Sequence, residues 1–298
     1  MAIQWFPGHM HAARKQVAET MAKVDLVIEI VDGRLPWSSS NPMIERLRLA
    51  RQRPALKILN KSDLADPKLS RVWLDWFKAQ DGVDAILMGE EDKKASAARL
   101  PALCSKLVPH RTGEIKPVRA LILGIPNVGK STLMNHLARR KIANVADTPG
   151  VTKSQQRIEL QSGMILYDTP GLLWPKVHDE NSGYRLAMAG SIGTNAYDQV
   201  DVAWFAIETL RERYPQALLD RYGLKDYVDD VEAMFAMIAK RRGAVLSGGR
   251  IDEQKAAELI LTDFRSGALG RITLETPDDI TELPVDGEPE ADVAEGGQ

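Results

Sequence analysis

A glycine-rich loop in the middle of the chain has the residue types and spacing that bind phosphate groups. The stretch from Gly124 to Ser131 follows the pattern Gly-x-x-x-x-Gly-Lys-Ser, and its glycines allow backbone N–H groups to converge on an anion. Lys130 would reach the β- and γ-phosphate oxygens of a nucleotide and is therefore also a catalytic candidate, while the Ser131 hydroxyl would ligate Mg²⁺. The candidate phosphate-binding residues of this loop are Pro126, Asn127, Val128, Gly129, Lys130, Ser131 and Thr132.

A carboxylate later in the chain is the candidate that completes the metal site. The tetrapeptide Asp-Thr-Pro-Gly occurs twice, at 147–150 and 168–171, and only the second copy follows an apolar segment, 164–167. Ligands of open α/β sheets bind at the carboxyl edge of the strands. We therefore assign Asp168 to Mg²⁺, through a water molecule, and the Gly171 N–H to the γ-phosphate.

The first copy of the tetrapeptide lies in a polar loop after an expected helix at 131–140. A switch segment in this place would supply a threonine to Mg²⁺ when a triphosphate is bound. Thr152 is the candidate for this role, and Thr148 is the alternative.

The tetrapeptide Asn60-Lys61-Ser62-Asp63 has the residue types that recognise guanine, and it directly follows the apolar segment 55–59. Guanine presents two adjacent donors, N1–H and the 2-amino group, and one carboxylate can accept both. Adenine lacks this donor pair, so ATP would leave the carboxylate charge unpaired. Asn60 would hold the loop and contact the base edge, the Lys61 stem would cover the ring face, and a backbone N–H near residues 87–89 would meet guanine O6. The candidate guanine-binding residues are Asn60, Lys61, Asp63 and Met88.

These motifs must be positioned by strands that end beside them and by helices that follow. Strands that alternate with helices predict an α/β fold with a mostly parallel sheet and helices on both of its faces. We expect strands at 24–31, 55–59, 83–88 and 118–123, a hairpin pair at 157–160 and 164–167, and helices at 9–23, 67–79, 94–107 and 131–140.

The last third of the sequence has helical periodicity only, which predicts a small all-helical domain. We expect helices at 199–213, 215–222, 228–242 and 252–265. The predicted organisation is an N-terminal arm and helix at 1–23, a nucleotide-binding domain at 24–178, a linker at 179–198, a helical domain at 199–276 and an acidic disordered tail at 277–298.

Composition narrows the class of protein. The chain has 298 residues, a hydrophobic fraction of 44% and a single cysteine, Cys104, so an internal disulfide framework is excluded. No apolar run approaches the ~20 residues that cross a bilayer, and no secretory signal is evident, so we expect a cytoplasmic monomer without a membrane partner. Eight of the 41 acidic residues lie in 277–298, which leaves 39 basic against 33 acidic residues in the rest of the chain. This mildly basic body is compatible with a nucleic-acid partner but does not require one.

The order of the two nucleotide motifs is reversed relative to ordinary GTPases, in which the phosphate loop comes first. This order, together with further motifs that span nearly the whole chain, resembles ribosome biogenesis GTPase A, a family of circularly permuted GTPases. The motifs that carry the resemblance are Trp5-Phe6-Pro7-Gly8-His9-Met10, Asp32-Gly33-Arg34-Leu35-Pro36, Asn60–Asp63, Gly124–Thr132, Pro149-Gly150-Val151-Thr152-Lys153, Asp168–Gly171 and Phe264–Arg271.

The resemblance implies a GTP-hydrolysing factor that acts in assembly of the large ribosomal subunit, with a helical domain that contacts ribosomal RNA. It also implies that His9 replaces the water-orienting glutamine of Ras-type enzymes, since Leu172 takes that place here. Asn127 is the residue type that lets related GTPases bind K⁺ beside the phosphates. Basic residues that could neutralise RNA phosphates are Lys240, Arg241, Arg242, Arg250, Lys255, Arg265 and Arg271.

Three alternatives stay open at the level of sequence. His9 could cap or pack the first helix instead of orienting water. With Leu172 and Leu173 beside the γ-phosphate, intrinsic hydrolysis should be slow, and the protein could be a GTP-dependent ribosome-binding scaffold with vestigial hydrolysis. A P-loop kinase or ATPase is the third alternative, and the charge of Asp63 argues against it.

Overall fold

The computed structural model describes residues 10–111, 116–138, 156–168 and 179–280, with side chains from residue 15 onward. Its first half is a six-stranded sheet in the order β3-β2-β1-β4-β6-β5. All neighbouring strands are parallel except β5 and β6, which form the expected antiparallel pair. The strands are β1 (Leu26–Asp32), β2 (Ala55–Asn60), β3 (Val83–Met88), β4 (Arg119–Gly124), β5 (Gln156–Glu159) and β6 (Ile165–Asp168).

Helices cover both faces of this sheet, and alternate residues of β1 explain how. Leu26, Ile28 and Ile30 pack in one core with α4 and α5, whereas Val27 and Val31 pack in a second core with α1, α2 and α3. A central parallel strand buries both of its faces, which is why β1 is apolar almost throughout. The helices are α1 (Met10–Met21), α2 (Pro42–Ala50), α3 (Pro67–Lys78), α4 (Lys93–Leu107) and α5 (Lys130–Ala138).

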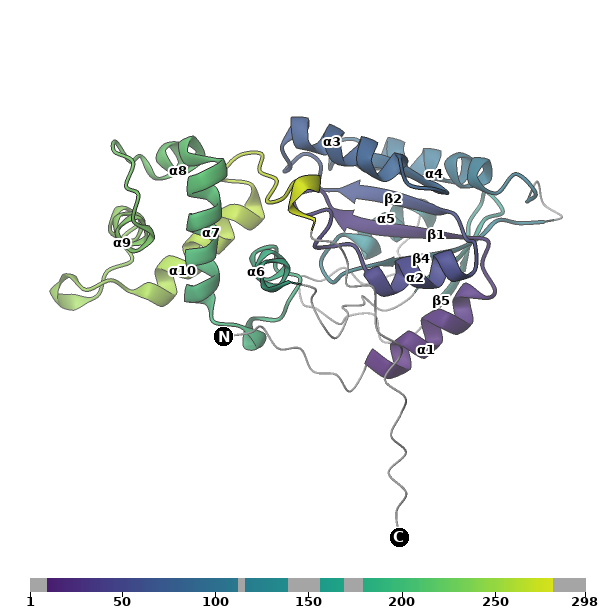
Figure 1. The fold of residues 1–298 in the computed structure, drawn as a ribbon, viewed down its shortest axis with the longest axis horizontal. Helices are drawn as coiled ribbons and strands as arrows, with labels where there is room; N and C mark the ends of the chain where they lie inside the picture. The colour runs from purple at the N-terminus through teal and green to yellow at the C-terminus, as the bar shows by residue number, and fades with distance from the viewer. Residues whose placement is uncertain (1–9, 112–115, 139–155, 169–178, 281–298) are drawn as a thin grey trace, which may run out of the picture.

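The second half of the described chain is helical and lies beside the sheet domain, on the left in Figure 1. Its core is continuous with the core beneath α4 and α5. The helices are α6 (Glu180–Met188), α7 (Gln199–Arg213), α8 (Pro215–Tyr222), α9 (Val231–Arg241) and α10 (Glu253–Ser266). None of the helices in the described part of the chain is long and apolar enough to span a membrane.

Two expected boundaries differ from the structure. Residues 179–198 were predicted to be a linker, but they contain α6, whose side chains are buried against α7 and α10. The acidic tail was predicted to start at 277, but Pro277–Asp279 form a short 3-10 helix, and Asp279 accepts hydrogen bonds from Arg213. Both segments belong to the folded body, and only 281–298 of the expected tail lie outside the described residues.

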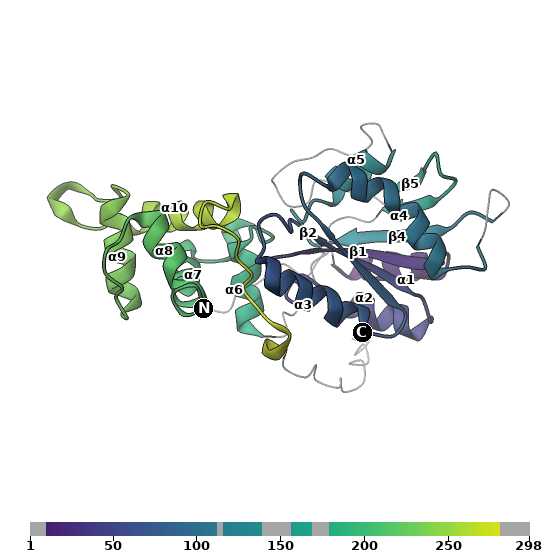
Figure 2. The ribbon, with the colours of Figure 1, turned by 90° about the horizontal axis from the view of Figure 1, so that it is seen from above.

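After α10 the chain turns back to the sheet domain. This return segment, residues 270–280, is drawn in yellow-green to yellow and crosses from α10 to the sheet domain in Figure 2. Its backbone donates to the sheet domain twice, from Ile272 N–H to the Leu64 carbonyl at 2.9 Å and from Leu274 N–H to the Arg34 carbonyl at 2.7 Å. The return segment therefore joins the C-terminal end of the helical domain to the sheet domain.

Candidate nucleotide-binding site

The carboxyl ends of the parallel strands bring the candidate residues to one edge of the sheet. Asp32, Asn60 and Met88 are register partners at the ends of β1, β2 and β3. On the other side of β1, β4 ends at Gly124 and β6 ends at Asp168. The base-reading and phosphate-binding motifs, which are about 60 residues apart in the sequence, therefore lie on neighbouring positions of one edge.

Glycine is required at two positions of the phosphate loop by close backbone approach. A methyl group on Gly124 would lie 2.8 Å from the Ile30 carbonyl oxygen, and one on Gly129 would lie 2.3 Å from Asn60 Nδ2. Gly129 also has a φ of +97°, which side chains rarely adopt. Asn127 has a φ of +59°, a left-handed conformation that asparagine tolerates better than most residues. The loop thus has the geometry of an anion-binding turn at the start of α5.

Lys130 and Asp168 form a buried ion pair at the start of α5 and the end of β6. Burial of both charges is tolerated because each neutralises the other. Lys130 is therefore held at the position from which it could turn to phosphate oxygens. Sequence analysis placed both residues in the site but did not predict that they pair with each other.

The donors around Asp168 suit a hard cation. Ser131 offers a hydroxyl at the first turn of α5, and Asp168 offers a carboxylate, which are the oxygen ligands that Mg²⁺ takes together with nucleotide phosphates. In the described part of the chain no cluster of three or more His, Cys, Asp or Glu could hold a metal by itself. The residues present therefore fit a metal that is shared with the nucleotide.

Asn60 connects the two motifs directly. Its side-chain Nδ2 donates to the Val128 carbonyl of the phosphate loop at 2.6 Å, and the side chain is buried. Its Oδ1 is also buried and has no hydrogen-bond partner among the described residues. A buried acceptor of this kind costs free energy unless a ligand or water satisfies it. Asn60 thus lies where the two motifs meet and carries one acceptor that the described residues leave unsatisfied.

Lys61 is anchored to the end of β1. Its backbone is left-handed, with a φ of 57°, and its Nζ lies 2.9 Å from Asp32 Oδ2. Asp32 also receives both ends of the Arg34 guanidinium, at 2.9 and 2.8 Å. Burial alone would raise the pKa of Asp32, but the charges of Arg34 and Lys61 hold it well below its usual range. Burial lowers the pKa of Lys61, against the attraction of Asp32.

Asp63 is the exposed member of the base-reading tetrapeptide. Its Oδ1 accepts from the Glu90 N–H at 3.1 Å, which places residues 89 and 90 against the carboxylate. The Met88 side chain is buried in the core, while its carbonyl accepts from the Ser62 N–H at 3.1 Å. Any base contact from this segment would therefore come from backbone groups after Met88, and its thioether is not available.

The helical domain contacts the phosphate loop and the loop after β1, which sequence analysis did not predict. Asn127 Nδ2 donates to the Gly190 carbonyl, at the end of α6, at 2.8 Å. Arg34 is almost fully buried and donates to the Phe264 carbonyl at 3.2 Å, with its guanidinium 4.7 Å from the centre of the Phe264 ring. Arg34 stands in the motif Asp32-Gly33-Arg34, so the signal was in the sequence, but nothing in it indicated the partner.

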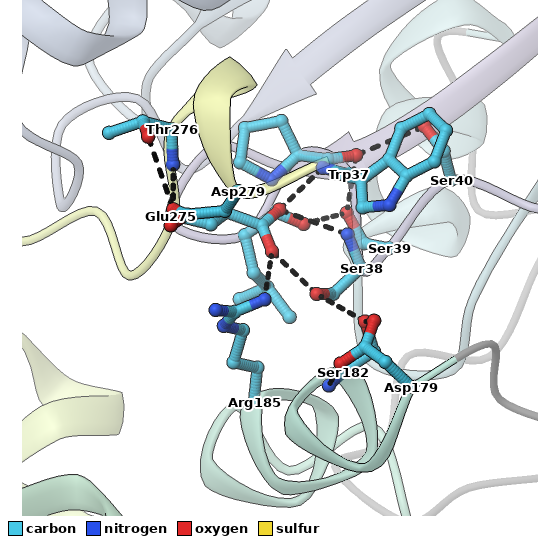
Figure 3. A network of polar contacts seen from close by, with 12 residues as sticks. Trp37, Ser38, Ser39, Ser40, Asp179, Ser182, Arg185, Glu275, Thr276 and Asp279 are labelled. Atoms are coloured by element: carbon cyan, nitrogen blue, oxygen red, sulfur yellow. Dashed lines mark hydrogen bonds and ion pairs between the residues drawn. The ribbon is translucent and has the colours of Figure 1, made fainter. Parts of the chain in front are cut away.

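A buried carboxylate, Glu275, also connects the sheet domain to the helical domain (Figure 3). Glu275 of the return segment accepts from the Trp37 and Ser38 N–H groups, from the Ser38 hydroxyl and from Arg185 of α6. Burial raises the pKa of Glu275, against the charge of Arg185 and these donors. The loop after β1, helix α6 and the return segment therefore meet at one side chain.

Several of the basic residues expected to face RNA have partners inside the protein. Arg265 donates to the Ala187 and Met188 carbonyls, and Arg271 donates to the Ser62 and Ala65 carbonyls. Arg265 therefore ties α10 to α6 within the helical half, and Arg271 joins the return segment to the sheet domain. His9, Thr152, Thr148, Gly171 and Leu172 lie outside the described residues.

A strand-loop-helix phosphate site, a base-reading loop that precedes it in the chain and an attached helical domain define a circularly permuted P-loop GTPase. Residues 119–239 match the family model described as 50S ribosome-binding GTPase. Ribosome biogenesis GTPase A of Bacillus cereus is 44% identical over 289 residues, covering 95% of this chain and 96% of that protein. The chain belongs to the ribosome biogenesis GTPase A family and is a GTP-binding ribosome assembly factor.

Solved structures agree with this assignment. The GDP-bound structure of TM YlqF matches this chain with a TM-score of 0.63 at 25% identity. The match covers 89% of this chain and 100% of the YlqF chain. GNP-bound YlqF from T. maritima has a TM-score of 0.61 at 26% identity, with coverage of 90% and 100%. The predicted fold, an α/β circularly permuted GTPase domain followed by a helical domain, is confirmed.

Proposed function

We propose that this protein hydrolyses GTP during assembly of the large ribosomal subunit and that its nucleotide state controls its binding to the subunit and its rRNA. The observation that carries the proposal is the contact of one helical domain with the phosphate loop, through Asn127 and Gly190, and with Arg34, through Phe264. Arg34 shares its carboxylate partner Asp32 with Lys61 of the base-reading loop. A change at the γ-phosphate would reach the helical domain through these contacts. The family model's description, 50S ribosome-binding GTPase, supports the large subunit as the partner.

In this function Pro126–Thr132 and the Gly171 N–H bind the phosphates, and Asp63 reads guanine with Asn60 and Lys61. The buried, unsatisfied Asn60 Oδ1 supports the base site. The ion pair of Lys130 and Asp168 supports the phosphate site, because a nucleotide would draw the lysine to its phosphates.

Mg²⁺ is the expected cofactor, held by Ser131, Thr152 and Asp168, where it would neutralise charge on the β- and γ-phosphates. K⁺ is a second expected ion, at Asn127. The Asn127 amide nitrogen is directed to Gly190, so the amide oxygen is the atom of this side chain that would take a cation.

Two residues of the chain would have separate roles in hydrolysis, one in stabilising charge on the phosphoryl group and one in activating water. Lys130 would stabilise charge that develops on the transferred phosphoryl group. His9 would orient or deprotonate the attacking water, since a histidine titrates near neutrality and Leu172 cannot do so. The intrinsic rate is expected to be slow until a partner arranges these groups. The protein is expected to act as a cytoplasmic monomer.

GTP turnover with and without large ribosomal subunits tests this proposal. We expect slow turnover by the free protein and an increase of at least about tenfold on addition of large subunits, because partners that complete a GTPase site commonly act on this scale or above. Small subunits are the control and should have no effect. Tight subunit binding without faster turnover would instead favour the ribosome-binding scaffold with vestigial hydrolysis.

A further inference from the structure

The base-reading loop is held by a residue that lies about 200 positions later in the chain. Arg271 is the second residue of the return segment, and its guanidinium donates from Nε to the Ala65 carbonyl at 3.0 Å and from NH2 to the Ser62 carbonyl at 2.9 Å. These two carbonyls stand on either side of Asp63. One rigid, planar group therefore sets the backbone at both ends of the turn that carries the guanine-reading carboxylate.

A second set of contacts holds the same loop from the helical domain. Leu64, the residue after Asp63, packs so closely on Gly267 that a methyl group on this glycine would lie 2.6 Å from Leu64 Cδ2. The Ile272 N–H donates to the Leu64 carbonyl at 2.9 Å. The end of α10 and the start of the return segment thus form a support under the loop, and Arg271 supplies its charged part.

The Asp63 side chain itself has little support. It is exposed, and the described residues give its Oδ1 one backbone donor, the Glu90 N–H. Its direction toward a base therefore depends mainly on the backbone of residues 62–65. Recognition of two adjacent donors by one carboxylate is sensitive to this direction, because both hydrogen bonds must be aligned at once.

We infer that Arg271 is a positioning residue for guanine recognition: it aligns Asp63 with the guanine edge and so makes nucleotide specificity depend on how the helical domain is seated. The inference rests on the base site described under the proposed function. It gives the arginine a task that its surface position alone would not suggest. Because binding is reciprocal, a bound guanine would also favour the seated state of the helical domain.

The test compares affinities for GDP and inosine diphosphate, which differ only in the 2-amino group of the base. Arg271→Ala should lower GDP affinity about tenfold, the size expected for a misaligned hydrogen bond to a charged group. Inosine diphosphate affinity should fall by a smaller factor, because inosine can lose only its N1–H bond to Asp63. Arg271→Lys should give an intermediate ratio, because a point charge cannot bridge both carbonyls. A purely structural role would weaken both ligands in the same proportion.

Two controls separate the possible failures. Arg211→Ala removes an arginine whose ion pair with Asp229 lies within the helical domain, and it should leave the affinity ratio unchanged. Asp63→Ala should abolish the preference for GDP. If the preference does not depend on Asp63, the base site of the proposed function is wrong. If it depends on Asp63 but survives in Arg271→Ala, the inference about Arg271 alone is overturned.

Discussion

Asp32 links the helical domain to the base-reading loop through two basic side chains. Its carboxylate accepts from Arg34, which extends to the helical domain, and from Lys61, which belongs to the base-reading loop. Lys61 is therefore held beside the site before any nucleotide binds. A buried charge with two partners of opposite sign is stable only as long as all three groups stay ionised.

The depressed pKa of Asp32 predicts how stability depends on pH. A carboxyl whose pKa is lower in the folded than in the unfolded state stabilises the fold above its unfolded pKa, here about 3.8, and this stabilisation is lost as the pH falls below that value. Asp32→Asn should cost about 3 kcal/mol at pH 7, since it leaves Arg34 without its buried partner. The difference between variant and wild type should shrink below pH 3.8.

Denaturant unfolding at pH 7, 5 and 3.5 measures this difference. Asp229→Asn is the control, because Asp229 is 91% exposed in its ion pair with Arg211 and its loss should not change stability measurably. If the difference in unfolding free energy between Asp32→Asn and wild type stayed constant down to pH 3.5, the ionised Asp32 would not be the source of that difference.

Two loops from different strands form the site by direct contact, and the contact is tightest at Gly129. Its Cα lies so near Asn60 that any side chain would displace the hydrogen bond from Asn60 to the Val128 carbonyl. The base-reading loop and the phosphate loop are therefore fitted to each other. A change at this position should affect both ends of the nucleotide.

Gly129→Ala and Gly163→Ala form a matched pair for this element. Both glycines have positive φ, +97° and +80°, so alanine should cost about 1 to 2 kcal/mol of backbone strain at either position. Only Gly129 has a neighbour in the way, because nothing lies within 4 Å of a methyl group on Gly163. We expect GDP affinity to fall at least about tenfold in Gly129→Ala and to stay unchanged in Gly163→Ala. Equal GDP affinities in the two variants would contradict the proposal that contact between the base-reading loop and the phosphate loop shapes the site.

Most elements could be predicted from the sequence, and the exceptions have a physical reason. The parallel strands were found because they are mostly apolar segments, interrupted by single charged residues such as Glu29 and Lys57, and both nucleotide motifs follow such segments. Helix α6 was missed because its buried positions include a glycine, Gly183, and two polar residues. Ser182 and Arg185 face polar partners, Ser38 and Glu275. An inward face of this kind does not give the apolar period of a helix.

Helix α2 was missed although a start signal was present. Asn41 caps it through a hydrogen bond from the Met43 N–H, and Pro42 occupies the first turn, which is a typical beginning of a helix. Its nine residues alternate short apolar and charged stretches, too few for a clear period. The contacts of Arg34, Gly190 and Arg271 could not be predicted at all, because local sequence does not say which distant carbonyl a side chain will meet.

At the scale of the whole molecule, the helical domain is attached to the GTPase domain at several separate places. Asn127 meets the end of α6, Arg34 meets the end of α10, and the return segment runs back to the base-reading loop. The reversed order of the motifs makes this possible, because the chain enters the helical domain after the γ-phosphate motif at 168–171 and leaves it beside the base. The helical domain and the return segment thus contact the phosphate loop at Asn127 and the base-reading loop at Ser62 and Leu64.

Such an arrangement predicts that the two nucleotide states differ in how the helical domain is presented. The central claim is that this difference controls binding to the large ribosomal subunit. Sedimentation of the protein with purified large and small subunits, in GDP and in a non-hydrolysable GTP analogue, tests it most directly. We predict binding to the large subunit that is about tenfold tighter with the analogue than with GDP, within the usual range of allosteric coupling. Equal binding in the two states, or no preference for the large subunit, would contradict it.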